Sequence, residues 1–66
     1  MKTMSCNLKY ILEHKNISPQ DLSFDSRVPA SQIYKYVKGE VFPGLEAALR
    51  IARALYTPVE SIWVLI

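Results

Sequence analysis

The sequence predicts an all-α fold, and helix signals in three stretches support this prediction. Residues 18–39 begin with a Ser-Pro pair, which is a typical helix start, and end on a glycine, which is a typical helix stop. Residues 45–55 place apolar side chains at the spacing of a helix. Residues 57–60 have the sequence Thr-Pro-Val-Glu, which combines a capping hydroxyl, a proline for the first turn and an acid near the helix start.

The stretch 18–39 is expected to form two short helices joined by a tight turn. Ser18 can cap the first helix, and Pro19 loses no hydrogen bond in the first turn. The chain has to leave this helix before Val28, because a residue that precedes proline avoids the helical conformation. A second helix is then expected at 30–38, ended by the glycine that follows it.

The expected helix at 30–38 has two different faces. At about 100° per residue, its apolar side chains fall on one arc and its polar and basic side chains on the opposite arc. The apolar arc consists of Ile33, Tyr36 and Val37, and the polar arc consists of Ser31, Tyr34, Lys35 and Lys38, with Gln32 beside it. The apolar arc can hold such a helix on a scaffold while the polar arc meets base edges and phosphates in the DNA major groove. A solvated helix without a partner explains the same pattern equally well.

An ordered set of residues extends this pattern over most of the chain. The set consists of Leu8, Leu12, Ile17, Ser18, Leu22, Val28, Ser31, Ile33, Gly39, Pro43, Gly44, Leu45, Glu46, Leu49, Ile51, Ala52, Ala54, Leu55, Val59, Ile62 and Trp63. With these residues at these spacings, the chain resembles the helix-turn-helix family of phage Cro and lambda repressor, also called the XRE family. The resemblance implies a five-helix, lambda-repressor-like domain that binds DNA as a dimer, with the helix at 30–38 as its recognition helix.

Four positions depart from the pattern of that family. Ser23 replaces the usual alanine and is nearly as small. Arg27 replaces the usual glycine of the turn, which costs on the order of 1 kcal/mol if the residue keeps a left-handed conformation. Pro29 stands where a capping serine is usual, and Val37 replaces a common glutamate. None of these changes removes the expected fold.

Composition limits the classes of function. The chain has 66 residues, half of them hydrophobic, and is expected to form a single small domain over residues 1–66. Its net charge is only +2, so binding to a polyanion would depend on where the charges lie rather than on their number. No apolar stretch reaches the roughly 18 residues of a membrane span. We therefore expect a cytoplasmic protein without membrane contact.

Metal, cofactor and enzyme roles are not expected. Cys6 is the one cysteine of the sequence, which excludes an internal disulfide and a multi-cysteine metal site. His14 is the one histidine, and no second ligand or acid–base partner stands at a suitable spacing from it. The chain is also short for an enclosed substrate pocket. We expect no metal, no cofactor and no enzymatic activity.

The segments around the helix pair are expected to complete a helical core. Residues 1–5 are expected to lead into a first helix that contains Cys6, ends near Lys15 and is capped by Thr3 or Ser5. Phe24 is expected to pack against a neighbouring segment, and residues 41–42 to cover the core. The helix at 45–55 is expected to be the most buried, with Leu45, Ala48, Leu49, Ile51, Ala52 and Leu55 inside. In the last helix, Thr57 is expected to be the cap.

The C-terminal residues 63–66 are all apolar, namely Trp63, Val64, Leu65 and Ile66. Periodicity does not decide between the end of a helix and a short strand. An exposed apolar end needs a cover, which is either the core of the same chain or a second copy across a two-fold axis. We favour the second copy slightly, because operators present two half-sites about one helical turn apart. These four residues are therefore the expected dimer interface.

The favoured function is a homodimeric transcriptional regulator that binds a double-stranded DNA operator by sequence. The residues expected to contact bases are Ala30, Ser31, Gln32, Tyr34 and Lys35. The residues expected to contact phosphate are Ser18, Gln20, Arg27 and Lys38. The alternative is a protein-interaction module, for example the antitoxin of a toxin–antitoxin pair, with Phe24 or the C-terminus as its contact.

Overall fold

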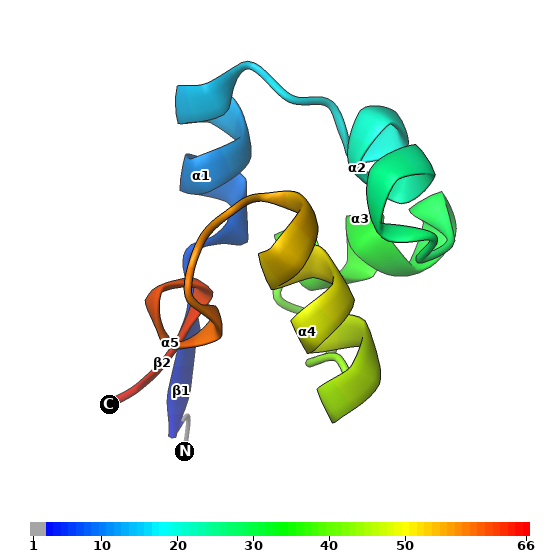
Figure 1. Cartoon of the computed structure of the whole chain (residues 1–66). Coiled ribbons are helices and arrows are strands. Elements are labelled where there is room, and N and C mark those ends of the chain that lie inside the picture. Colours follow the sequence, from blue (N-terminus) through cyan, green and yellow to red (C-terminus); the bar gives the residue numbers. More distant parts are fainter. Residues whose placement is uncertain (1–2) are drawn as a thin grey trace.

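The computed structural model describes residues 3–66, which form five helices and one two-stranded sheet (Figure 1). The elements are β1 (Met4–Cys6), α1 (Leu8–Lys15), α2 (Pro19–Ser26), α3 (Ala30–Lys38), α4 (Leu45–Ala54), α5 (Val59–Ile62) and β2 (Trp63–Leu65). The predicted helical fold and the helix pair at 18–39 are confirmed. The small sheet was not predicted.

The sheet joins the two ends of the chain. β1 and β2 are antiparallel, with Met4 opposite Leu65 and Cys6 opposite Trp63. The pairing continues beyond both strands, because the Ile66 N–H donates to the Thr3 carbonyl at 3.0 Å and the Asn7 N–H donates to the Ile62 carbonyl at 2.7 Å. Of the two alternatives for residues 63–66, the strand is therefore the one that forms, and it folds back on its own chain.

This pairing corrects the expected start of the first helix. Thr3 and Ser5 cap nothing, since the residue before α1 is Asn7, which makes no side-chain cap bond. Its side-chain amide instead donates to the Ser61 carbonyl at 3.2 Å. Cys6 lies in β1, and its thiol donates to the Tyr36 carbonyl at 3.4 Å. Residues 1–2 of the expected lead-in lie outside the described residues.

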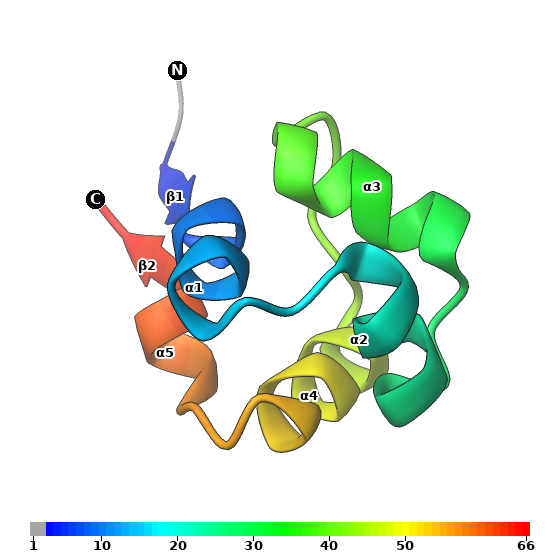
Figure 2. The ribbon, with the colours of Figure 1, turned by 90° about the horizontal axis from the view of Figure 1, so that it is seen from above.

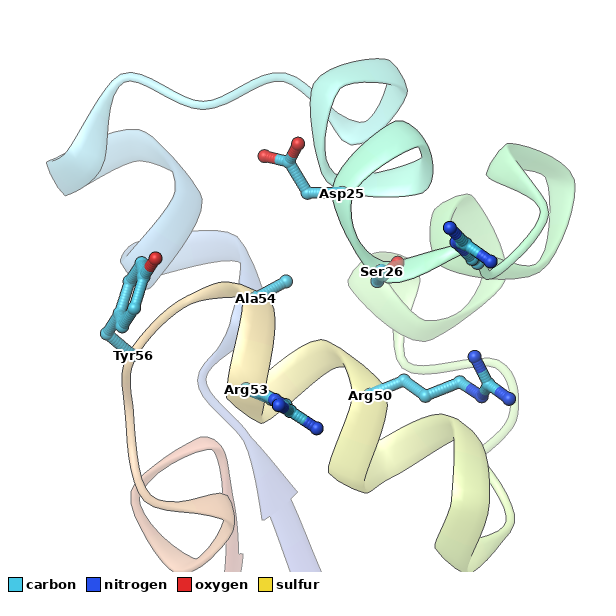
Figure 3. A pocket seen from close by; sticks show the side chains of 7 residues that line it. Asp25, Ser26, Arg50, Arg53, Ala54 and Tyr56 are labelled. Carbon is cyan, nitrogen blue, oxygen red and sulfur yellow. The ribbon is translucent and has the colours of Figure 1, made fainter.

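The helices are arranged so that α2 lies between α3 and α4 (Figure 2). The exposed side of α3 therefore faces away from α4. On the other side of α2, its C-terminal end and the outer face of α4 border an open hollow that contains arginine side chains (Figure 3). The two sides of α2 thus present two separate polar surfaces.

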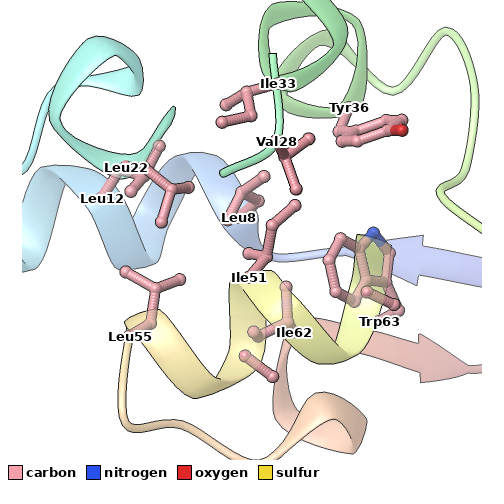
Figure 4. Close-up of a cluster of buried hydrophobic side chains, with 12 residues drawn as sticks. Leu8, Leu12, Leu22, Val28, Ile33, Tyr36, Ile51, Leu55, Ile62 and Trp63 are labelled. Atoms are coloured by element: carbon pink, nitrogen blue, oxygen red, sulfur yellow. The ribbon is translucent and has the colours of Figure 1, made fainter. Parts of the chain in front are cut away.

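The core is formed by apolar side chains from every helix and from β2 (Figure 4). Six of them are fully buried, namely Leu8, Leu22, Ile33, Ile51, Leu55 and Ile62. Two leucines expected in this core lie outside it, since Leu45 is 75% exposed and Leu49 is 50% exposed. At about 100° per residue, Leu45 lies at the edge of the buried face of α4, and Leu49 lies further round the helix. The buried face of α4 is therefore narrower than expected.

Three further expectations were wrong, two of them about packing and one about a helix cap. Phe24 is 87% exposed on α2, so little of its ring is covered by other described residues. Val41 and Phe42 are both more than two-fifths exposed and form at most a partial cover. The Thr57 hydroxyl donates to the Leu55 carbonyl at 2.9 Å, and α5 has no side-chain cap. An apolar residue type does not by itself decide burial, because much of any folded surface is apolar.

We expect Arg27→Gly to stabilise the fold. Arg27 ends α2 in the left-handed conformation with φ 62°. That conformation costs a residue with a Cβ about 1–2 kcal/mol, while glycine adds unfolded-state entropy of about 0.5–1 kcal/mol. The free energy of unfolding should rise by about 0.5–1 kcal/mol in urea denaturation. Asn16→Gly is the control, because Asn16 has a similar φ of 59° and asparagine tolerates it. An equal gain for both variants would show that strain at Arg27 is not the cause.

Candidate nucleic-acid interface

The start of α2 is fixed by its own side chains. The Ser18 hydroxyl oxygen accepts a hydrogen bond from the Asp21 N–H at 3.1 Å, and Pro19 occupies the first turn. This is the cap that the sequence predicted. The hydroxyl hydrogen of Ser18 is not used in that bond, and both Ser18 and Gln20 are exposed. The start of α2 can therefore donate to an anion.

The turn between α2 and α3 is held by a buried serine. The Ser26 hydroxyl donates to the Leu22 carbonyl at 2.6 Å and accepts from the Val28 N–H at 3.3 Å. Ser26 is only 4% exposed, and the neighbouring Val28 is buried as well. Sequence reasoning missed this role, although a serine at a helix end can bond to a backbone group four residues back. The two bonds fix the direction in which α3 leaves the turn.

α3 has the two faces that the sequence predicted. Ile33 is fully buried, Tyr36 is nearly so, and Val37 is half-buried. The exposed residues are Ser31, Gln32, Tyr34, Lys35 and Lys38, whereas Ala30 is half-buried at the start of the helix. α1 packs against the inner side of α3. α3 is thus a rigid element that presents hydroxyl, amide, phenol and ammonium groups to solvent.

The cations at this surface are not neutralised by neighbouring acids. Within residues 3–66, the one ion pair joins Arg50 to Glu46 on α4, with 2.8 Å between the closest nitrogen and oxygen. Lys35 and Lys38 both lie in the last turn of α3, and the sequence has no acid between Ser26 and Gly39. Their ammonium groups therefore produce a positive field in front of α3.

The candidate phosphate contacts lie at separate places. Ser18 and Gln20 are at the start of α2, and Arg27 is at its opposite end, which is about 12 Å away for eight residues at 1.5 Å rise. Lys38 lies at the end of α3, next to Gly39, whose φ of 75° closes that helix. These residues do not form one cluster. Lys38 lies on α3 itself, Ser18 and Gln20 lie at the start of α2, and Arg27 borders the hollow at the C-terminal end of α2.

The candidate dimer residues separate into two groups. Trp63 is only 6% exposed and packs in the core of its own chain (Figure 4). Its assignment to a dimer surface was therefore wrong, because a buried indole has little area left for a partner. Leu65 and Ile66 are 78% and 81% exposed, and Val64 is also exposed. Of the expected interface, residues 64–66 remain available.

Two further features of the described chain bear on the class of site. No helix in residues 3–66 is both long enough and apolar enough to cross a membrane. The same residues contain no group of three or more His, Cys, Asp or Glu side chains placed to hold a metal ion.

The helix pair, its fixed turn and its basic outer helix define a DNA-binding protein of the helix-turn-helix class. A family model described as helix-turn-helix matches residues 8–62, which is most of the chain. The chain therefore belongs to this helix-turn-helix family, that of the Cro and lambda-repressor-like (XRE) proteins. A search of curated proteins finds no match to it.

Proposed function

We propose that this protein is a homodimeric transcriptional regulator that recognises a double-stranded DNA operator by sequence, with α3 in the major groove. The observation that carries the proposal is the exposed side of α3. Two lysines that form no ion pair within residues 3–66, two hydroxyl groups and an amide project there from a helix anchored by the buried Ile33 and Tyr36. A helix of this kind suits a groove lined by base edges and flanked by phosphates.

The roles of the residues follow from their chemistry. Lys35 suits the O6 and N7 acceptors of guanine, and Gln32 suits the N6 and N7 atoms of adenine. Ser31 and Tyr34 offer hydroxyl groups to either kind of base, and the methyl group of Ala30 suits a thymine methyl at the groove edge. Ser18, Gln20, Arg27 and Lys38 would bind phosphates and fix the register of α3.

Selection from a random duplex library tests the proposal. The bound DNA is sequenced, and affinity for the selected site and for unrelated DNA is followed across salt concentrations. We expect a two-fold symmetric consensus whose half-sites are about one helical turn apart. We also expect the affinity to fall steeply with salt, because bound phosphates release counterions. Weak binding without an enriched sequence would overturn the proposal.

The homodimer would use the exposed end of the chain. β2 pairs only with β1 in residues 3–66, so the other side of each strand is unpaired there, next to the apolar side chains of residues 64–66. An unpaired strand edge with apolar neighbours is a template for a second strand. A second copy that binds there would cover both the edge and the apolar side chains.

Leu65→Lys is expected to shift the dimer to monomer. A two-fold axis brings equivalent residues close together, so each interface would gain two like charges in place of two apolar contacts. The mass in solution, measured by sedimentation over a range of concentrations, should fall to that of one chain. Phe24→Lys is the matched control, because Phe24 is similarly exposed on α2. Dissociation by Phe24→Lys, or a dimer that survives Leu65→Lys, would place the interface elsewhere.

A second candidate function is a protein-interaction module, for example an antitoxin. The observation that favours it is Phe24, a large aromatic side chain left 87% exposed on α2. Aromatic residues are enriched at protein interfaces. Salt separates the two functions, because binding through phosphates weakens steeply with salt and binding through an apolar surface does not.

A further inference from the structure

The hollow between α2 and α4 is a second polar surface, distinct from the exposed side of α3. Its volume is about 640 Å³, which is within the range of small-molecule sites. The residues that line it are Asp25, Ser26, Arg27, Arg50, Arg53, Ala54 and Tyr56 (Figure 3). Three arginines from two separate parts of the chain therefore border one concave space.

The charges of this hollow do not cancel. Asp25 is the one acid among its lining residues, and it forms no ion pair within residues 3–66. Arg50 is paired with Glu46, but that contact is on the surface, where an ion pair holds its partners weakly. Arg27 and Arg53 have no acidic partner in the same part of the chain. The hollow thus carries more positive than negative charge in a chain whose total is only +2.

Two residues of the lining have unusual backbone conformations. Within residues 3–66, three residues other than glycine have positive φ, and two of them, Arg27 and Tyr56, border this hollow. Neither residue type favours the left-handed conformation, and such conformations gather at functional sites. Tyr56 is also 95% exposed, so its ring contributes little to the stability of the core. The aromatic face of Tyr56 is therefore left open at the edge of the hollow.

We propose that this hollow binds a nucleotide. Guanidinium groups match phosphate oxygens in a planar, two-bond geometry, so Arg27, Arg50 and Arg53 suit the phosphate chain. An exposed aromatic ring suits the face of a nucleobase, because every base offers a π-face for stacking. Arg27, Arg50 and Arg53 would therefore hold the charged end of the ligand, and Tyr56 its base. The exposed carboxylate of Asp25 is suited to a sugar hydroxyl.

The hollow lies apart from the proposed base contacts on α3. α2 separates α4 from α3, so a nucleotide in the hollow does not cover the exposed side of α3 (Figure 2). A nucleotide in the hollow is therefore compatible with base contacts by α3, whereas the operator phosphate assigned to Arg27 would compete with the nucleotide. Arg27 is the one residue assigned to both sites, and it is left unchanged in the tests.

The test uses three probes on the full chain at about 0.15 M salt, an ionic strength that screens exposed charges beyond roughly 8 Å. ATP carries both phosphates and base, tripolyphosphate carries only phosphates, and adenosine carries only the base. We expect ATP to bind more tightly than tripolyphosphate and adenosine to bind weakest, by calorimetry. Amide chemical shifts should move at residues 25–27 and 50–56. Shifts concentrated at residues 31–38 would overturn the proposal, since the anion would then occupy the DNA-binding side.

Two variants separate the two ends of the ligand. Arg53→Gln should weaken ATP and tripolyphosphate alike by about tenfold, the loss expected for one charged hydrogen bond. Tyr56→Asn removes the ring and introduces a residue type that tolerates positive φ. It should weaken the binding of ATP by about tenfold and leave the binding of tripolyphosphate unchanged.

Lys15→Gln is the matched control for Arg53→Gln, because Lys15 and Arg53 are both exposed cations in the last turn of a helix. It should change neither affinity by more than about twofold, as expected for a distant surface charge. Equal losses in Lys15→Gln and Arg53→Gln would mean general attraction of anions, and the site would not exist. The same conclusion follows if none of the probes binds. Operator binding is measured separately in every variant, so a failure of this site is distinguishable from a failure of DNA binding.

Discussion

Ile51→Ala is expected to remove about 2–5 kcal/mol from the free energy of unfolding. Ile51 has no exposed area, and it lies in the core among side chains from α1, α3 and α5 (Figure 4). A chain of this size is expected to have a total stability of about 3–10 kcal/mol, from about 0.05–0.15 kcal/mol per residue. The single substitution should therefore leave a large fraction of the protein unfolded at 37 °C. Urea denaturation followed by circular dichroism measures the loss.

Leu49→Ala is the matched control for this result. Leu49 belongs to the same helix and also loses apolar side-chain atoms, but it is 50% exposed. Its loss should stay below about 1 kcal/mol, because alanine is the better helix former and no cavity is created. If both variants lose the same stability, then Leu49 is covered in solution. A second chain lying over α4 would be the direct explanation, and a concentration-dependent midpoint would identify it.

Lys35→Ala is expected to lower the preference of the protein for its operator over unrelated DNA. A side chain that contacts a base edge contributes about 1–3 kcal/mol of discrimination, which corresponds to roughly 5- to 150-fold in the affinity ratio. Lys35 is exposed on α3, one turn after Ser31 and beyond the half-buried Ala30. The expected signature is a large loss on the selected operator, a small loss on random duplex and a weaker preference at one position of the consensus.

Lys38→Ala serves as the comparison, because it removes the same type of charge from the last turn of the same helix. As a phosphate contact, Lys38 should contribute equally on every sequence, so both affinities fall together. The slope of log affinity against log salt should decrease by about one. Fluorescence anisotropy with operator and random duplexes across salt gives both quantities. Equal losses on both duplexes in both variants would contradict the separate roles of the two lysines.

The parts of the fold that were predictable are those with local causes. The Ser18 cap and the terminating Gly39 depend on residues within one or two turns of helix, which the sequence displays directly. The faces of α3 follow from helical spacing alone. Each of these expectations agrees with the structure.

The parts that were missed depend on residues far apart in the chain. β1 becomes a strand only because β2 lies beside it, and Met4 faces a partner near the opposite end of the sequence. Residue type could not distinguish the exposed Phe24 from a core phenylalanine, since burial depends on which helix lies opposite. The sequence likewise did not indicate that Arg50 and Arg53 of α4 lie near Arg27, which was expected to contact phosphate. Arg27 and Arg53 are brought to one space only by the packing of α2 against α4.

The β1–β2 pairing has a consequence for the order of folding. It joins Met4 to Leu65, so almost the whole chain forms the loop that this contact closes. The entropy of closing a long loop has to be overcome before the contact contributes anything, whereas the contacts between α2 and α3 close only a few residues. The sheet should therefore form after the helices have packed against one another. A strand edge at β2 then exists only on chains whose helices are already assembled, so two nascent chains have little opportunity to pair through it before each has folded.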